Sequence, residues 1–91
     1  MELKDTVELM TSSSWKDRFI AEYAQTKIRY EKLHAMAIKR EVDKCPFETP
    51  IPLDSWNAQL YHMGHYLHEL EKQAAIHEIE LPKTYLGGRD D

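Results

Sequence analysis

Three histidines and a glutamate recur in the second half of the chain, and imidazole and carboxylate groups are common zinc ligands. His62, His65 and His68 are spaced every third residue, and Glu69 follows His65 by four. A helix turns once in about 3.6 residues, so side chains three residues apart point in progressively different directions. The three imidazole rings therefore do not converge on one point. No second cluster of such residues completes a set of metal ligands. The three histidines are better placed to face solvent or to contact another copy of the chain. We predict no metal site and no cofactor.

The first half of the chain carries a row of mostly cationic side chains, which is a better candidate site than the histidines because it suits phosphate binding. Arginine offers a planar fork of donors and lysine a mobile point charge. The rings of Trp15 and Tyr23 lie nearby and could stack on bases. A solvated face on which Glu22 balances Arg29 is the commoner alternative, and spacing leaves both readings open. The row, called the cationic row below, has members three or four residues apart that share one helix face: Arg18, Glu22, Gln25, Arg29, Lys32, Met36 and Lys39.

The sequence signatures of catalysis do not occur in this chain. Its three glycines, Gly64, Gly87 and Gly88, cannot build a phosphate-binding loop of the P-loop or Rossmann kind. Its one cysteine, Cys45, has no plausible catalytic partners, and there is no nucleophile elbow. We therefore expect a binding protein and not an enzyme.

A long helix must carry the cationic row. Ser14 followed by Asp17 has the spacing of a capping box, and no glycine or proline occurs from Trp15 to Asp43. Apolar and aromatic residues repeat in steps of four and three, which is the heptad pattern of a helix with one buried seam. This predicts a helix over about 15–43. The seam residues are Phe19, Tyr23, Thr26, Tyr30, Leu33 and Ala37.

A second helix follows a loop with three prolines between Cys45 and Leu53. Asp54 or Ser55 could cap it, and the heptad rhythm then continues toward Pro82, which predicts a helix over about 55–80. Gly64 inside this helix costs about 1 kcal/mol relative to alanine, so we expect another backbone or a ligand close to it. The seam residues are Trp56, Leu60, Met63, Leu67, Leu70 and Ala74, with His77 and Leu81 extending the series.

Two long helices and a short connection predict an all-α, antiparallel, coiled-coil-like hairpin. The hairpin domain is residues 14–81, after a lead-in over 1–13 with a short helix near Thr6–Met10, and before a flexible tail over 82–91. The apolar residues outside the seams would form a larger patch than a monomer tolerates. We expect a homo-oligomer, with contact to a different protein as the alternative. These residues are Ile20, Ala24, Ile28, Met36, Ile38, Tyr61, Tyr66, Ala75 and Ile79.

Composition narrows the class of partner. The 91 residues carry a net charge of −4, which argues against bulk nucleic-acid binding. Residues 15–44 hold eight Lys and Arg against five acids, whereas residues 54–80 hold one Lys against five acids. This asymmetry fits either attraction between the helices or a cationic strip for an anionic ligand. No apolar run approaches the roughly 18 residues of a membrane span, and the charged N-terminus lacks a signal-peptide core, so we expect a cytoplasmic protein.

Two stretches, RFIAEYAQTKIRYEKLHAM (18–36) and QLYHMGHYLHELEKQAAI (59–76), resemble the helical hairpin of small phage proteins that includes the anti-CBASS cyclic-oligonucleotide sponge. A related hairpin occurs in an anti-Thoeris sponge and in small proteins of crAss-like and Firmicutes phages, and the ending AAIHEIEL is closest to the latter branch. The matching features are Arg18, Glu22, the Lys32–Leu33 pair, and Gln59, Leu60, Met63, Tyr66 and Leu70.

The resemblance implies a phage or prophage counter-defence protein in the cytoplasm of a bacterial host. It would sequester cyclic di- or trinucleotides between the protomers of a homo-oligomer, hexameric in the sponge, without cleaving them. Lys32 would hold a ligand phosphate, and an aromatic residue near the start of the first helix would stack on a base. Asp17 occupies the expected aromatic position, and Trp15 is the nearest aromatic residue. The candidate ligand-binding residues are Trp15, Arg18, Tyr23, Arg29 and Lys32.

Overall fold

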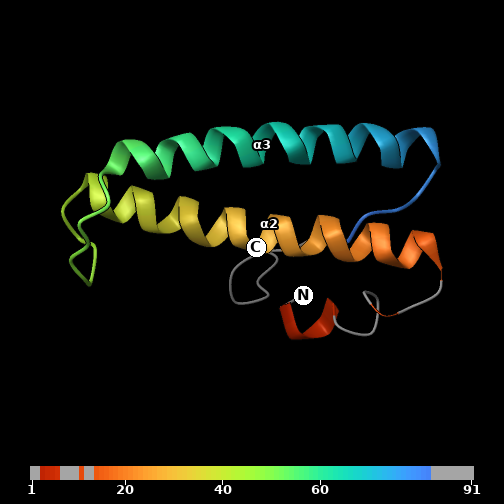
Figure 1. Cartoon of the computed structure of the whole chain (residues 1–91), viewed down its shortest axis with the longest axis horizontal. Coiled ribbons are helices and arrows are strands. Elements are labelled where there is room, and N and C mark those ends of the chain that lie inside the picture. Colours follow the sequence, from red (N-terminus) through yellow and green to blue (C-terminus); the bar gives the residue numbers. More distant parts are fainter. Residues whose placement is uncertain (1–2, 7–10, 12–13, 83–91) are drawn as a thin grey trace.

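The computed structural model describes residues 3–6, 11 and 14–82, which form a helical hairpin with one short additional helix. The elements are the 3₁₀ helix η1 (Leu3–Thr6), the helix α2 (Trp15–Glu41) and the helix α3 (Leu53–Ile76). Helices α2 and α3 lie side by side and antiparallel, and η1 lies on the side of α2 that is turned away from α3 (Figure 1). The predicted all-α hairpin is confirmed for this part of the chain.

The two predicted seams face each other and form the core. Toward the open end of the hairpin, Tyr23 of α2 packs with Leu67 and Leu70 of α3. Toward the loop, Ala37 packs with Trp56 and Leu60. The heptad spacing therefore identified both buried stripes, because a side chain every three or four residues returns to the same face of a helix.

Two hydrogen bonds of the same kind fix the register of the helices. The Tyr23 hydroxyl on α2 donates to Glu71 Oε2 on α3 at 3.0 Å. In the opposite direction, the Tyr66 hydroxyl on α3 donates to Glu22 Oε2 on α2 at 2.9 Å. Burial and the contact with Glu71 raise the pKa of Tyr23 above its usual value. Sliding one helix by a turn would break both bonds as well as the seam, so together they specify one alignment.

Both helices end in a Schellman motif with an acidic residue in the left-handed conformation, where glycine is usual. Asp43 has φ 60° and Glu78 has φ 55°. The left-handed residue reverses the chain, so that the backbone N–H of the next residue donates to a carbonyl of the last helical turn. The closing bonds are Lys44 N–H to the Lys39 carbonyl at 2.7 Å and Ile79 N–H to the Ala74 carbonyl at 2.8 Å.

The helix bounds differ from the sequence prediction at three places. Helix α2 ends at Glu41 and not at 43, and α3 spans 53–76 and not 55–80. The left-handed Glu78 stops α3 before Pro82 is reached, and Pro52 rather than Asp54 or Ser55 is the N-cap of α3. Ser14 is the N-cap of α2 as predicted, but its side chain makes no capping hydrogen bond.

Helix η1 covers part of the apolar face that was expected to need a partner. The Gln25 side chain on α2 donates to the Thr6 hydroxyl in η1 at 2.9 Å, and Thr6 is fully buried. On the same face of α2, Ala24 and Ile28 are 0% and 4% exposed. These two side chains were expected to need another copy or a different protein, but they are already covered within the chain. Other apolar groups do stay exposed, among them Ile38, Tyr61 and Tyr66.

Some predictions fall outside the described residues. The short helix near Thr6–Met10 involves residues 7–10, and the flexible tail involves residues 83–91, and neither stretch is described. None of the helices described here is long and apolar enough to cross a membrane.

Candidate functional site

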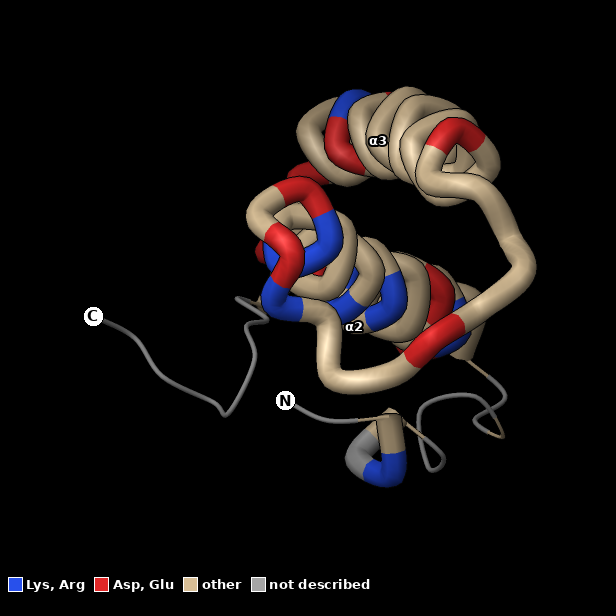
Figure 2. The backbone as a smooth tube through the Cα atoms, turned by 90° about the vertical axis from the view of Figure 1, so that its left-hand side faces the viewer, with Lys and Arg blue, Asp and Glu red and all other residues tan. Residues whose placement is uncertain are grey.

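The cationic row lies on α2 between α3 and the face that η1 covers. Its two non-cationic polar members mark the edges, because Glu22 accepts the hydrogen bond from Tyr66 of α3 and Gln25 donates to Thr6 of η1. Lys and Arg recur along α2 (Figure 2), whereas Lys72 is the one Lys or Arg of α3. Met36 is half-buried and packs against the Trp56 cluster, so it belongs to the core and not to the open surface of the row.

Three cations of this row reach solvent in the second half of α2. Arg29, Lys32 and Lys39 are all exposed. Arg29 and Lys32 are three residues apart, and side chains at this spacing are neighbours on a helix surface, with Cβ atoms about 5–6 Å apart. The two heads can therefore reach the oxygens of one phosphate together, which makes this pair the centre of the candidate anion site.

Trp15 and Arg18 lie at the other end of α2, where the cationic row begins with Arg18. The Trp15 side chain is 48% exposed, and its ring meets His77 from the end of α3 in an edge-on contact with 5.0 Å between ring centroids. Arg18, one turn later, is also exposed. At 1.5 Å per residue, Arg18 and Lys32 are separated by roughly 21 Å along the helix. One chain therefore does not bring Trp15 and Lys32 to the same small ligand.

Tyr23 occupies the seam and is 5% exposed. Its ring packs among Leu67, Leu70 and partly buried neighbours, and its hydroxyl is bonded to Glu71. In this hairpin the ring presents no open face to a base. Its assignment to ligand binding stays a prediction that requires the two helices to separate locally.

Two of the three histidines, His65 and His68, line a hollow of about 310 Å³ on α3 together with Tyr61 and Gly64. The Tyr61 ring contacts His65 at 4.4 Å and His62 at 5.4 Å between centroids. Among the residues described, no group of three or more His, Cys, Asp or Glu side chains is placed to hold a metal ion. The imidazoles of His62 and His65 thus pack against the Tyr61 ring.

Gly64 contacts a side chain of α2. A Cβ at Gly64 would lie 3.6 Å from Tyr30 Cε1, which is an ordinary van der Waals distance. The expectation of a close backbone or ligand is therefore not met within the hairpin. An alanine would fit at this position.

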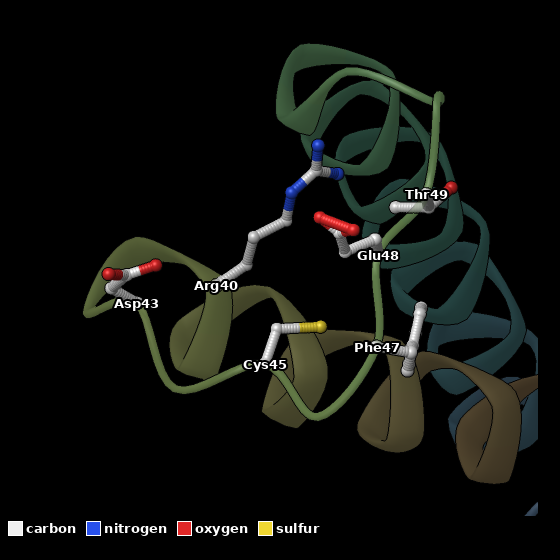
Figure 3. A pocket seen from close by; sticks show the side chains of 6 residues that line it. All are labelled: Arg40, Asp43, Cys45, Phe47, Glu48 and Thr49. Atoms are coloured by element: carbon white, nitrogen blue, oxygen red, sulfur yellow. The ribbon is translucent and has the colours of Figure 1, made fainter.

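A second pocket, which sequence reasoning missed, lies at the loop end of the hairpin. It measures about 280 Å³ and is lined by Arg40, Asp43, Cys45, Phe47, Glu48 and Thr49 (Figure 3). The loop brings these residues together because α2 ends in its left-handed turn and the prolines then direct the chain back toward α3. No spacing rule signals such a site, since its residues follow no helical or strand period.

The structure thus defines a small helical hairpin with a cationic face on α2. A family model, Sequestin, matches residues 13–76, which include α2, the loop and α3. The chain belongs to the Sequestin family, and this confirms the resemblance to the anti-CBASS sponge hairpins. Its members are sequestering, counter-defence proteins of phages that bind small signalling molecules. No curated protein and no solved structure matches the chain.

Proposed function

We propose that this protein sequesters cyclic di- or trinucleotides in the cytoplasm of a phage-infected bacterium without cleaving them. The observation that carries the proposal is membership of the Sequestin family over both helices of the hairpin. The exposed pair Arg29 and Lys32 supports an anionic ligand, because a guanidinium and an ammonium together complement a phosphate diester.

The length of the cationic row favours a site shared between copies. Trp15 and Arg18 lie too far from Lys32 to share a small ligand within one chain, but a second hairpin could bring its own Trp15 beside Lys32 of the first. Under this arrangement the base stacks on an exposed ring from one copy and the phosphate contacts cations from the other. A twofold axis would repeat the contact and match a ligand with two similar phosphates.

Isothermal titration against a panel of cyclic di- and trinucleotides tests the proposal. We expect at least one member to bind at micromolar protein concentration, and Lys32→Ala to weaken that binding by about tenfold or more, since a hydrogen bond to a charged group is worth about 1.5–3 kcal/mol. Lys72→Ala is the matched control, because Lys72 is an exposed lysine of α3 that pairs with Glu69 at 3.1 Å. No heat with any member, or equal losses in both variants, would contradict the proposal.

Sequestration without cleavage has its own test. Ligand bound to the protein for hours and then released by heat denaturation should be recovered intact by chromatography. Linear or monomeric products would instead indicate hydrolysis.

Self-association is part of the proposal. Tyr61 is 63% exposed and Ile76 is 74% exposed, and burying such groups between copies would be favourable by about 25 cal/mol per Å². We expect a homo-oligomer, a hexamer by analogy with the sponge, in native mass spectrometry at micromolar concentration. A monomer that stays folded there would contradict a shared site.

The same exposed groups favour one alternative. Tyr61 and Ile76, together with the acidic Glu69, give α3 an apolar and acidic surface for docking to a host defence or replication protein. Glu69→Lys is the better probe of this surface, because reversing Glu71 would also break the bond with Tyr23. Stoichiometric capture of one host protein that Glu69→Lys abolishes would favour this alternative over sequestration.

A further inference from the structure

The loop pocket holds a fixed cation with an unused donor. The Arg40 guanidinium lies over the Trp56 ring, with its carbon 4.7 Å from the ring centroid. Stacking of this kind holds the guanidinium plane in place and favours the cation. Arg40 Nη1 is buried and has no hydrogen-bond partner. An unsatisfied buried donor is unfavourable, so a small shift of the Arg40 side chain that brings Nη1 against an acceptor in the pocket would give this atom the bond it lacks.

A carboxylate faces the same space. Figure 3 shows the Glu48 side chain pointing toward the Arg40 guanidinium, while Asp43 lies apart at the end of α2. Although both residues line the pocket, the structure forms no ion pair between Arg40 and Glu48. Each of the two groups therefore keeps hydrogen-bonding capacity for a third molecule between them.

The charges disfavour a simple anion here. One cation, Arg40, is accompanied by two acidic side chains, Asp43 and Glu48. A free phosphate would gain one partner and meet two like charges. The complement of this pocket is a neutral group that offers an acceptor to Arg40 and, beside it, donors to Glu48.

Guanine provides this combination along one edge. Its O6 accepts from an arginine, which is the commonest specific contact to this base. Its adjacent N1–H and N2 amino groups donate side by side, and an ionised carboxylate accepts with both oxygens. Phe47 lines the pocket and is 48% exposed, so it offers an aromatic face to a flat ring. The volume of about 280 Å³ lies just below the usual range of ligand pockets, about 300–1,000 Å³, as expected for a single base.

We propose that the loop pocket binds a guanine base, with Arg40 donating to O6, Glu48 accepting from N1–H and the N2 amino group, and Phe47 stacking on the ring. Its use for a guanine-containing signalling nucleotide rests on the proposed function. The pocket itself does not, because it lies outside the cationic row.

A phosphate-free probe separates this site from Lys32. Guanosine is titrated into ¹⁵N-labelled protein to low millimolar concentration, and the Arg40 Nε–Hε and Phe47 amide signals are followed. We expect saturable shifts of both signals with guanosine. Inosine, which lacks only the N2 amino group, and adenosine should each bind at least fivefold more weakly. No shift with guanosine, or equal shifts with all three nucleosides, would overturn the assignment.

Two substitutions test the named residues. Glu48→Gln should reduce the preference for guanosine over inosine to less than twofold. Arg40→Lys should weaken the binding of guanosine by about tenfold. Lys32→Ala should leave the affinity for guanosine unchanged. The amide spectrum of each variant verifies the fold. Guanosine binding that survives both pocket substitutions would refute the site. A protein that binds guanosine but no cyclic oligonucleotide would uphold the pocket and refute sequestration, and the converse result would do the opposite.

Discussion

The two Tyr–Glu bonds across the hairpin differ in burial, and this difference predicts unequal energies. We consider Tyr23→Phe with Tyr66→Phe as its matched control. Each substitution removes one hydroxyl that donates to a glutamate of the other helix, at 3.0 Å and 2.9 Å respectively. Tyr23 is 5% exposed, whereas Tyr66 is 44% exposed. The chemistry is the same, so the environment decides the effect.

The expected change in the free energy of unfolding depends on whether water can replace the lost hydroxyl as a partner of each glutamate. A hydrogen bond to a charged group contributes about 1.5–3 kcal/mol when it is well shielded. Glu71 is exposed, so water replaces the lost donor and no buried charge is left unpaired. We therefore expect Tyr23→Phe to lower the free energy of unfolding by about 1–1.5 kcal/mol, and Tyr66→Phe by about 0.5 kcal/mol or less, because water already competes for its bond.

Urea unfolding followed by helical circular dichroism measures both values, at one fixed protein concentration because assembly would shift the midpoint. The m value should stay unchanged, since neither substitution alters the surface exposed on unfolding by much. Equal destabilisation by the two substitutions, or a larger effect of Tyr66→Phe, would refute the argument from burial.

The pH dependence gives an independent measurement of the same bond. Burial first, and then the contact with Glu71, raise the pKa of Tyr23 above the usual value near 10. The unfolded chain therefore releases this proton at lower pH than the native state does. The stabilisation is fully present below about pH 10 and is lost as the pH rises toward the native pKa. Tyr23→Phe should flatten this alkaline loss, and an unchanged alkaline profile would contradict the assignment.

Three further substitutions test other parts of the fold. Gly64→Ala should raise the free energy of unfolding by about 0.5–1 kcal/mol, because the added Cβ meets Tyr30 at an ordinary distance of 3.6 Å; a loss in urea unfolding would show that the contact is tighter. Glu78→Gly should raise the thermal midpoint by a few degrees, because φ 55° strains a residue with a side chain, and no gain would mean that Glu78 bears little strain. Leu67→Ala should lower the free energy of unfolding by about 2–5 kcal/mol, because Leu67 is 4% exposed in the core, and a loss below 1 kcal/mol would place it outside the core.

Periodicity predicted most of the hairpin because each seam is a local property of one helix. Residues such as Leu33 and Leu67 fall on their stripes by counting along the chain, and the proline-rich loop marks the reversal of direction. The helix ends were predicted less well. Asp43 and Glu78 adopt a conformation that glycine usually signals, so their types gave no stop signal.

Part of the candidate site was also predicted from residue spacing, and part was not. Arg29 and Lys32 share an exposed face as their spacing predicted. Tyr23 was predicted both as a seam residue and as a stacking residue, and the structure has it in the seam. The apolar face around Ile28 could not be assigned from spacing, because η1 is distant in sequence and covers it only after the chain folds back.

The amino-acid sequence alone determined two helices, their buried stripes, the connecting loop and the cationic row, because all of these depend on which residues recur within a few turns of one helix. Only the tertiary structure decided the register set by the Tyr–Glu bonds, the burial of Ile28, and the loop pocket around Arg40. These features depend on distances between segments that no local period encodes, and the packing of side chains across the hairpin fixes those distances.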